Sequence, residues 1–186
     1  NGARKQLERS LEITRKVLGT DEHPDVAASL HALACVLSAQ GDLNGARKQL
    51  ERSLEIKRKV LGTDEHPSVA ASLHSLAQVL RAQGEPVEAE EMLRRVLEIE
   101  AGIYGTREHY STAETEFALG MLLIENGKTE EGGQLVAHAL EVLRAQVPGH
   151  PILEQFGQIA SGISPADTAR AALAARQSGL RSEALD

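Results

Sequence analysis

The chain has 186 residues, of which 41% are hydrophobic but only 2% aromatic, and its formal net charge is -7 at pH 7. The 26 alanines and 25 leucines favour helices, and the aromatic residues that favour strands are scarce, which excludes a β-sandwich or a β-barrel. The negative charge argues against nucleic acid as a partner, and the absence of any apolar run near the roughly 20 residues that span a bilayer argues against a membrane.

The first 86 residues consist of two nearly identical copies of one unit. Residues 1–43 align with residues 44–86 without a gap. The two copies differ at seven positions, namely Thr14/Lys57, Asp25/Ser68, Ala32/Ser75, Cys35/Gln78, Ser38/Arg81, Asp42/Glu85 and Leu43/Pro86. A third copy has diverged but keeps the spacing of 43, for example from Gly84 to Gly127. A fixed period of this length predicts a repeat architecture in which each unit packs on its neighbours.

Taken in chain order, the units predict about nine antiparallel helices in one array over residues 1–186. Residues 2–18 are expected to form a lone second helix, because the chain starts inside a unit. Two-helix repeats follow over 24–61, 67–104 and 109–146. Each first helix should begin at a His-Pro pair and end at a glycine, as Pro suits the first helical turn and Gly the residue that stops a helix. A degenerate repeat with a C-terminal cap is expected over 151–178, with helices at 151–163 and 165–178, followed by a frayed tail at 179–186.

The alternation of small and large residues resembles the tetratricopeptide repeat. The positions that carry the resemblance in the first full repeat are Leu30, Leu33, Ala34, Leu37, Ala46, Leu50 and Ser53. The longer period and the segments HPDVAASLHALA and LGTDEHP resemble the kinesin light chain subtype. The resemblance implies an all-α, right-handed superhelix, or α-solenoid, whose first helices line a concave groove.

By the same resemblance, the groove-facing positions hold the candidate peptide-binding residues. They are His31, Cys35, Ser38, His74, Gln78, Arg81, Glu114, Phe117, Met121 and Ile124. Two differences between the first two copies, Cys35/Gln78 and Ser38/Arg81, fall on these positions. Drift limited by packing and diversification driven by a ligand would both produce that pattern. Kinesin light chains carry an asparagine ladder where this chain has histidines, which argues against the same cargo recognition.

The first helix of the repeat at 109–146 permits two interpretations. Phe117, Met121 and Ile124 could supply apolar anchors for a bound peptide, flanked by Glu114 and Glu125. The alternative is that these side chains pack against the next repeat, since Phe117 and Ile124 lie seven residues apart and share one helix face.

The sequence predicts neither a metal site nor a cofactor. His23, His66 and His109 recur at the spacing of 43, so successive copies lie roughly 10 Å apart in stacked helices, too far to share an ion with ligand bonds of about 2 Å. We expect these histidines to cap helix starts instead. No phosphate loop, nucleophile elbow or zinc-protease motif is present, so we expect no catalytic residues and no enzyme activity.

The expected function is that of a protein- or peptide-binding scaffold or sensor domain that uses the concave groove. The chain lacks an initiator methionine and starts inside a unit, so we expect a fragment of a larger protein. Two alternatives stay open: self-association into a homo-oligomer, and regulation of an enzyme encoded elsewhere in the parent chain. The single cysteine, Cys35, favours a reducing compartment and hence the cytoplasm.

Overall fold

The computed structural model describes residues 2–156, and every regular element in that range is an α-helix. The helices are α1 (Gly2–Leu18), α2 (Pro24–Ala39), α3 (Leu43–Leu61), α4 (Pro67–Gln83), α5 (Pro86–Tyr104), α6 (Tyr110–Glu125), α7 (Thr129–Gln146) and α8 (Pro151–Phe156). They form two compact units, residues 1–103 and 104–186. The all-α prediction is confirmed, and helix starts at Pro24, Pro67 and Pro151 follow the His-Pro pairs as expected.

The repeated segment LGTDEHP is a complete helix–loop–helix connection. In its second copy, Gly62 ends α3 in the left-handed conformation with φ 67°, which costs little without a side chain. The hydroxyl of Thr63 then accepts a hydrogen bond from the backbone of Glu65 at 3.0 Å. Finally, His66 Nδ1 accepts the backbone N–H of Ser68 at 3.1 Å and caps α4. Gly62, Thr63 and His66 each satisfy a backbone group or set a dihedral angle, so the loop is encoded locally.

The same histidine cap occurs at four helix starts. Nδ1 of His23, His66, His109 and His150 accepts a hydrogen bond from the backbone N–H two residues later, at distances of 3.1 to 3.3 Å. In α2, α4 and α8 the first helical residue is proline, which has no N–H, so the first donor that needs an acceptor is the one the imidazole reaches. Helix α6 begins with Tyr110 instead of proline, and His109 caps it in the same way. The expected capping role of the repeated histidines is confirmed.

We expect His66→Ala to lower the free energy of unfolding by about 1 kcal/mol, the usual cost of removing an N-cap. His66→Asn should recover most of the loss, because the asparagine side chain also accepts the N–H of Ser68. Urea unfolding followed by circular dichroism measures both variants. Equal stability of His66→Ala and the unchanged protein would contradict the capping role.

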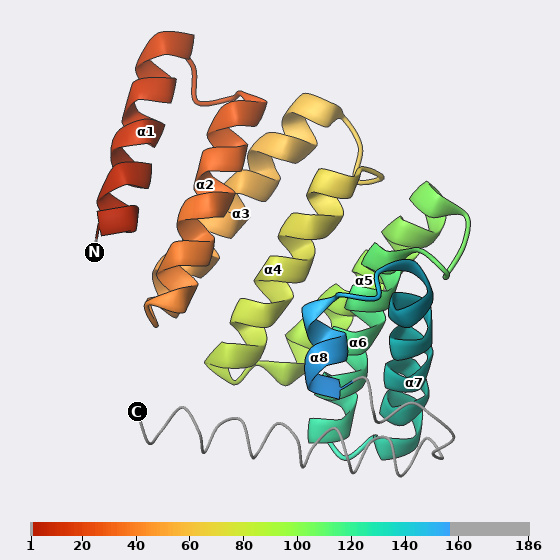
Figure 1. Cartoon of the computed structure of the whole chain (residues 1–186). Coiled ribbons are helices and arrows are strands. Elements are labelled where there is room, and N and C mark those ends of the chain that lie inside the picture. The colour runs from red at the N-terminus through yellow and green to blue at the C-terminus, as the bar shows by residue number, and fades with distance from the viewer. Residues whose placement is uncertain (1, 157–186) are drawn as a thin grey trace. The chain divides into compact units, whose positions relative to one another are not determined.

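In the first unit, successive helices pack side by side: α2 lies against α1 and α3, and α4 lies against α3 (Figure 1). Alanine permits the close approach of each pair, since Ala34 on α2 and Ala46 on α3 are fully buried. Leu30, Leu50 and Leu73 fill the space between the helices. The small-and-large pattern read from the sequence therefore corresponds to the interior of this unit.

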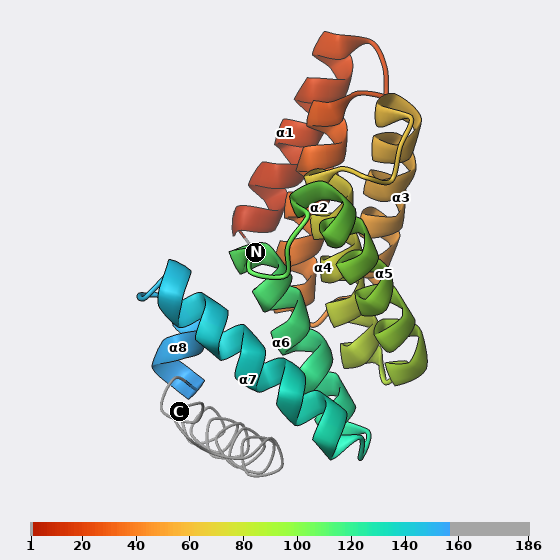
Figure 2. The same ribbon diagram turned by 90° about the vertical axis from the view of Figure 1, so that its right-hand side faces the viewer.

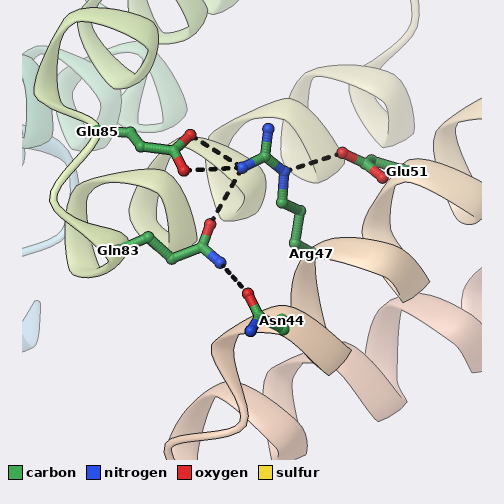
Figure 3. Close-up of polar contacts among 5 residues, drawn as sticks. All are labelled: Asn44, Arg47, Glu51, Gln83 and Glu85. Atoms are coloured by element: carbon green, nitrogen blue, oxygen red, sulfur yellow. Dashed lines mark hydrogen bonds and ion pairs between the residues drawn. The ribbon is translucent and has the colours of Figure 1, made fainter.

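Polar contacts fix the register between the second helix of one repeat and the turn of the next. Arg47 on α3 donates from Nη1 to both carboxylate oxygens of Glu85, at 2.9 and 3.0 Å, and from Nε to Glu51 at 3.0 Å (Figure 3). Gln83 donates to the side-chain oxygen of Asn44 at 2.8 Å. Arg4 makes the corresponding, longer contact with Asp42. Apart from the bond to Glu51 within α3, these contacts join residues 38 or 39 positions apart, so they hold neighbouring repeats at one spacing.

The second unit contains α6, α7 and α8, with α6 beside α7 and α8 on α7 (Figure 2). Helices α6 and α7 approach each other through two glycines. A Cβ atom on Gly120 would lie 2.7 Å from the carbonyl oxygen of Gly132, and one on Gly132 would lie 2.5 Å from that of Gly120. Glycine at these two positions therefore permits the close packing of α6 and α7.

Part of the expected helical array falls outside residues 2–156. The ninth helix at 165–178, the C-terminal part of the helix at 151–163 and the tail at 179–186 lie outside the described residues. That the two units continue each other as one array stays a prediction. None of the helices in residues 2–156 is both long enough and apolar enough to cross a bilayer.

Candidate functional site

Six of the ten candidate residues lie on two neighbouring helices of the first unit. His31, Cys35 and Ser38 follow one side of α2, and His74, Gln78 and Arg81 occupy the matching positions of α4. Cys35 and Gln78 are exposed, and the other four are half-buried. We call these six residues the α2/α4 face.

A pocket of about 380 Å³ opens on the α2/α4 face. Cys35 and Ser38 line it from α2, and Ser75 and Gln78 line it from α4. Ala34, Ala39, Leu50 and Val79 complete its wall. Three of the seven differences between the first two copies, those at positions 32/75, 35/78 and 38/81, supply residues to this wall.

His31 does not point freely into the groove. Its Nδ1 lies 3.1 Å from the hydroxyl of Ser72 on α4, and Lys57 on α3 donates to the same hydroxyl at 2.6 Å. Because that oxygen accepts from the ammonium group, its own hydrogen is available for Nδ1 of a neutral His31. Burial and the nearby Lys57 charge both lower the pKa of His31, and burial lowers the pKa of Lys57. This network ties three helices together beneath the α2/α4 face.

The α4 side of the face carries the cationic group. Burial lowers the pKa of Arg81. A neighbouring amide shares the same helix side, with Gln78 Nε2 2.9 Å from His74 Nε2. The α2/α4 face therefore combines small side chains, hydrogen-bonding groups and one guanidinium group.

The remaining candidates, in the second unit, lie mainly in its interior. Met121 and Ile124 are only 3% and 4% exposed and belong to one cluster with Val136, Leu140 and Phe156. Phe117 packs against Phe156 with ring centroids 5.2 Å apart. The prediction that Met121 and Ile124 belong to a peptide-binding surface is wrong, because both side chains are buried. They pack against the following helices, as the alternative interpretation predicted. Helix α8 contributes Phe156 to this cluster, and its Ile152 and Leu153 pack against it.

Glu114 is also engaged within the second unit. Its carboxylate lies 2.9 Å from Nε2 of His150, the residue that caps α8. This contact joins α6 to the start of α8.

Sequence reasoning missed a buried ionic cluster in the second unit. Glu116 is only 1% exposed, and its two oxygens contact Arg107 and His138. The corresponding position in the earlier copies holds the buried leucines Leu30 and Leu73. A glutamate at a repeat position that holds leucine in the two earlier copies is the sequence signal that could have revealed this cluster. The side chains of Arg107 and His138 are partly exposed, so both stay in contact with solvent on the side away from Glu116.

Metal binding gains no geometric support from the described part of the chain. Among residues 2–156, no three His, Cys, Asp or Glu side chains gather as a group that could hold an ion. The repeated histidines use Nδ1 to cap helices, and Cys35 is an exposed free thiol.

Comparisons with known proteins agree with this architecture. Models of the tetratricopeptide repeat match residues 1–25, 26–68 and 58–100. One similar solved structure contains the nearly identical TPR-like repeats of a kinesin light chain candidate from Podosopora anserina. Its sequence identity to this chain is 30% and the TM-score is 0.68, and the match covers 97% of this chain and 82% of that one. A variant of that protein gives 30% identity, a TM-score of 0.69 and coverages of 97% and 81%.

A more distant structure shows the same fold. BtubC (BKLC) from P. vanneervenii is 19% identical, with a TM-score of 0.66, and the match covers 83% of this chain and 64% of that one. No curated protein sequence matches the chain. The predicted α-solenoid class is thus confirmed, and such repeats are typical of non-catalytic scaffolds for protein interactions. The chain belongs to the tetratricopeptide repeat family and resembles its kinesin light chain-like members.

Proposed function

We propose that the chain is a scaffold that binds an extended peptide segment of a partner protein on the α2/α4 face. The observation that carries the proposal is the pocket of about 380 Å³ on this face. Its wall contains residues from three positions at which otherwise nearly identical copies differ. The buried positions Leu30, Leu50 and Leu73 keep their residue types between the copies, whereas three of the seven differences fall where a ligand would lie.

The face is held in place before any ligand arrives. Lys57 and His31 meet at Ser72 below it, and Arg47 joins α3 to the turn after α4. A surface whose side chains are already ordered loses less conformational entropy on binding, which leaves more of the contact energy as affinity. This supports recognition by preformed complementarity.

The chemistry of the face favours a particular class of peptide. Arg81 contributes a positive charge, and Cys35, Ser38 and Ser75 leave room for side chains of moderate size. A peptide with small or apolar side chains and an acidic residue fits better than a basic one, because like charges at an interface reduce affinity. The reducing compartment suggested by the single cysteine supports a cytoplasmic partner.

A displayed library of random peptides selected on the full chain tests the proposal. We expect acidic peptides whose affinity falls at least tenfold in Ser38→Phe, which fills the pocket, and in Arg81→Glu, which replaces the positive charge of the α2/α4 face with a negative one. Arg95→Glu is the matched control, since Arg95 is exposed on α5 and bonds Glu98. Fluorescence anisotropy gives the affinities, and circular dichroism verifies that each variant is folded. Selected peptides that bind all three variants equally would place recognition elsewhere.

A further inference from the structure

A separate pocket of about 380 Å³ opens in the first unit, between α3, α4 and α5. Its lining is partly apolar, with Leu76 and Leu80 from α4 and Met92 from α5. The rest of its wall is charged and consists of Arg47, Glu51, Glu88, Glu91 and Arg95. No residue is shared with the pocket on the α2/α4 face. We call this surface the α3/α5 pocket.

Both guanidinium groups in the wall of the α3/α5 pocket are already paired within the first unit. Arg47 bonds the carboxylates of Glu51 and Glu85 (Figure 3). Arg95 donates to Glu98 at 2.9 Å. Arg47 thus has two carboxylate partners for one positive charge, and the charge of Arg95 is balanced, so neither arginine calls for an acidic ligand.

Two carboxylates of the wall are unpaired. Glu88 and Glu91 are exposed on α5, and within residues 2–156 no hydrogen bond or ion pair joins either side chain to another residue. They lie three positions apart and therefore share one side of the helix. A lysine or arginine side chain in the pocket would find two acceptors that the fold does not use, beside an apolar lining for its neighbours.

The chemistry of the α3/α5 pocket is not required by the repeat fold. The preceding repeat carries different residues at the positions of Glu88, Glu91 and Met92. At the spacing of 43, these positions hold Gly45, Lys48 and Gln49 of α3. Helix α5 thus has two carboxylates and a flexible apolar thioether where α3 has a positive charge and an amide. Since α3 forms the same kind of helix without them, folding alone does not account for these residues.

We propose that the α3/α5 pocket is a second binding site, which takes a basic segment of another protein. A lysine or arginine of that segment pairs with Glu88 and Glu91, and an adjacent apolar side chain contacts Met92 and the two leucines of α4. Opposite charges across the contact favour this partner over an acidic one. The chain would then hold two segments of opposite charge, an acidic one on the α2/α4 face and a basic one here.

The test uses a displayed library of random peptides without aspartate or glutamate, selected on the full chain at about 0.15 M salt, which screens distant charges. We expect enrichment of peptides in which lysine or arginine lies beside leucine, isoleucine or methionine. Glu91→Lys should weaken their binding at least tenfold, because it places a like charge in the wall. Met92→Gln should also weaken it, because it removes part of the apolar lining. Fluorescence anisotropy with the selected peptides gives the affinities.

Both variants place in α5 the residues that α3 carries at the matching positions, Lys48 and Gln49, so both are compatible with the helix. Glu65→Lys is the matched control, since it changes the net charge by the same amount as Glu91→Lys. Glu65 is exposed in the connection between α3 and α4, outside the pocket wall. We expect unchanged binding by this control, and circular dichroism verifies that each variant is folded.

Two results would overturn the proposal. One is a selection in which no peptides with adjacent basic and apolar residues are enriched. The other is an affinity that Glu91→Lys leaves unchanged or that Glu65→Lys lowers to the same degree, since binding would then depend on the overall negative charge. The library contains no acidic peptides, so a failure here is distinct from a failure of the α2/α4 face.

Discussion

Ile56→Ala should lower the free energy of unfolding by about 3 kcal/mol, whereas Ile13→Ala should change it by no more than about 0.5 kcal/mol. Ile56 is 1% exposed, so its truncation leaves a cavity between helices. Ile13 is half exposed, and alanine also has the higher helix propensity. The two substitutions are identical in chemistry, and over residues 2–18 and 45–61 their sequence contexts differ only at Thr14 and Lys57, so their difference mainly measures tertiary burial.

Urea unfolding followed by circular dichroism measures this pair of variants. The shift of the midpoint should be large for Ile56→Ala and small for Ile13→Ala, with a similar denaturant slope for both. Native-state hydrogen exchange of α3 adds a local readout, because opening of that helix should become easier only in Ile56→Ala. Losses of equal size at the two positions would show that the burial of Ile56 contributes little.

Gly132→Ala should destabilise the α6–α7 pair by about 2 kcal/mol, although alanine is the better helix former by about 1 kcal/mol. The new methyl group would meet the backbone oxygen of Gly120 at 2.5 Å and the side chain of Ile124 at 2.8 Å. A backbone oxygen cannot rotate away as a side chain does, so the helices would have to separate. In earlier repeats the corresponding residues Ala46 and Ala89 are buried as alanines, which indicates that the close approach is particular to α6 and α7.

Gly149→Ala is the control for this prediction. Gly149 lies between α7 and α8, and a Cβ atom there would meet nothing within 4 Å. Its stability should match that of the unchanged chain in the same urea titration. A Gly132→Ala variant more stable than the unchanged chain would mean that helix propensity outweighs the contact and that α7 shifts easily.

The sequence was sufficient for the helices and their connections because the signals that define them are local. His66 binds an N–H two residues away, and Gly62 ends a helix through its own φ angle. The period of 43 residues then extended the prediction from one copy to the next. The family followed from the spacing of residues such as Ala34 and Ala46, whose small size the helix pairs require.

The candidate site could be predicted only in part. Cys35, Ser38 and Gln78 do line a pocket on neighbouring helices, as their helix positions suggested. Met121 and Ile124 occupy equivalent positions but are buried. Helical periodicity predicts which residues share a side of a helix, but it does not predict whether another helix covers that side.

The amino-acid sequence by itself thus determined where helices begin and end, their pairing into repeats and the fold class, since caps, turns and periodicity act over a few residues. Tertiary structure alone decided which helix faces are buried and which are exposed. Ile13 and Ile56 lie in helices that differ only at Thr14 and Lys57, yet they differ in exposure because α2 lies over Ile56 and not over Ile13. Glu116, at a position that holds leucine in earlier copies, is buried because Arg107 and His138 converge on its carboxylate. Burial is a property of packing between distant segments, and identical local sequences can therefore have opposite surroundings.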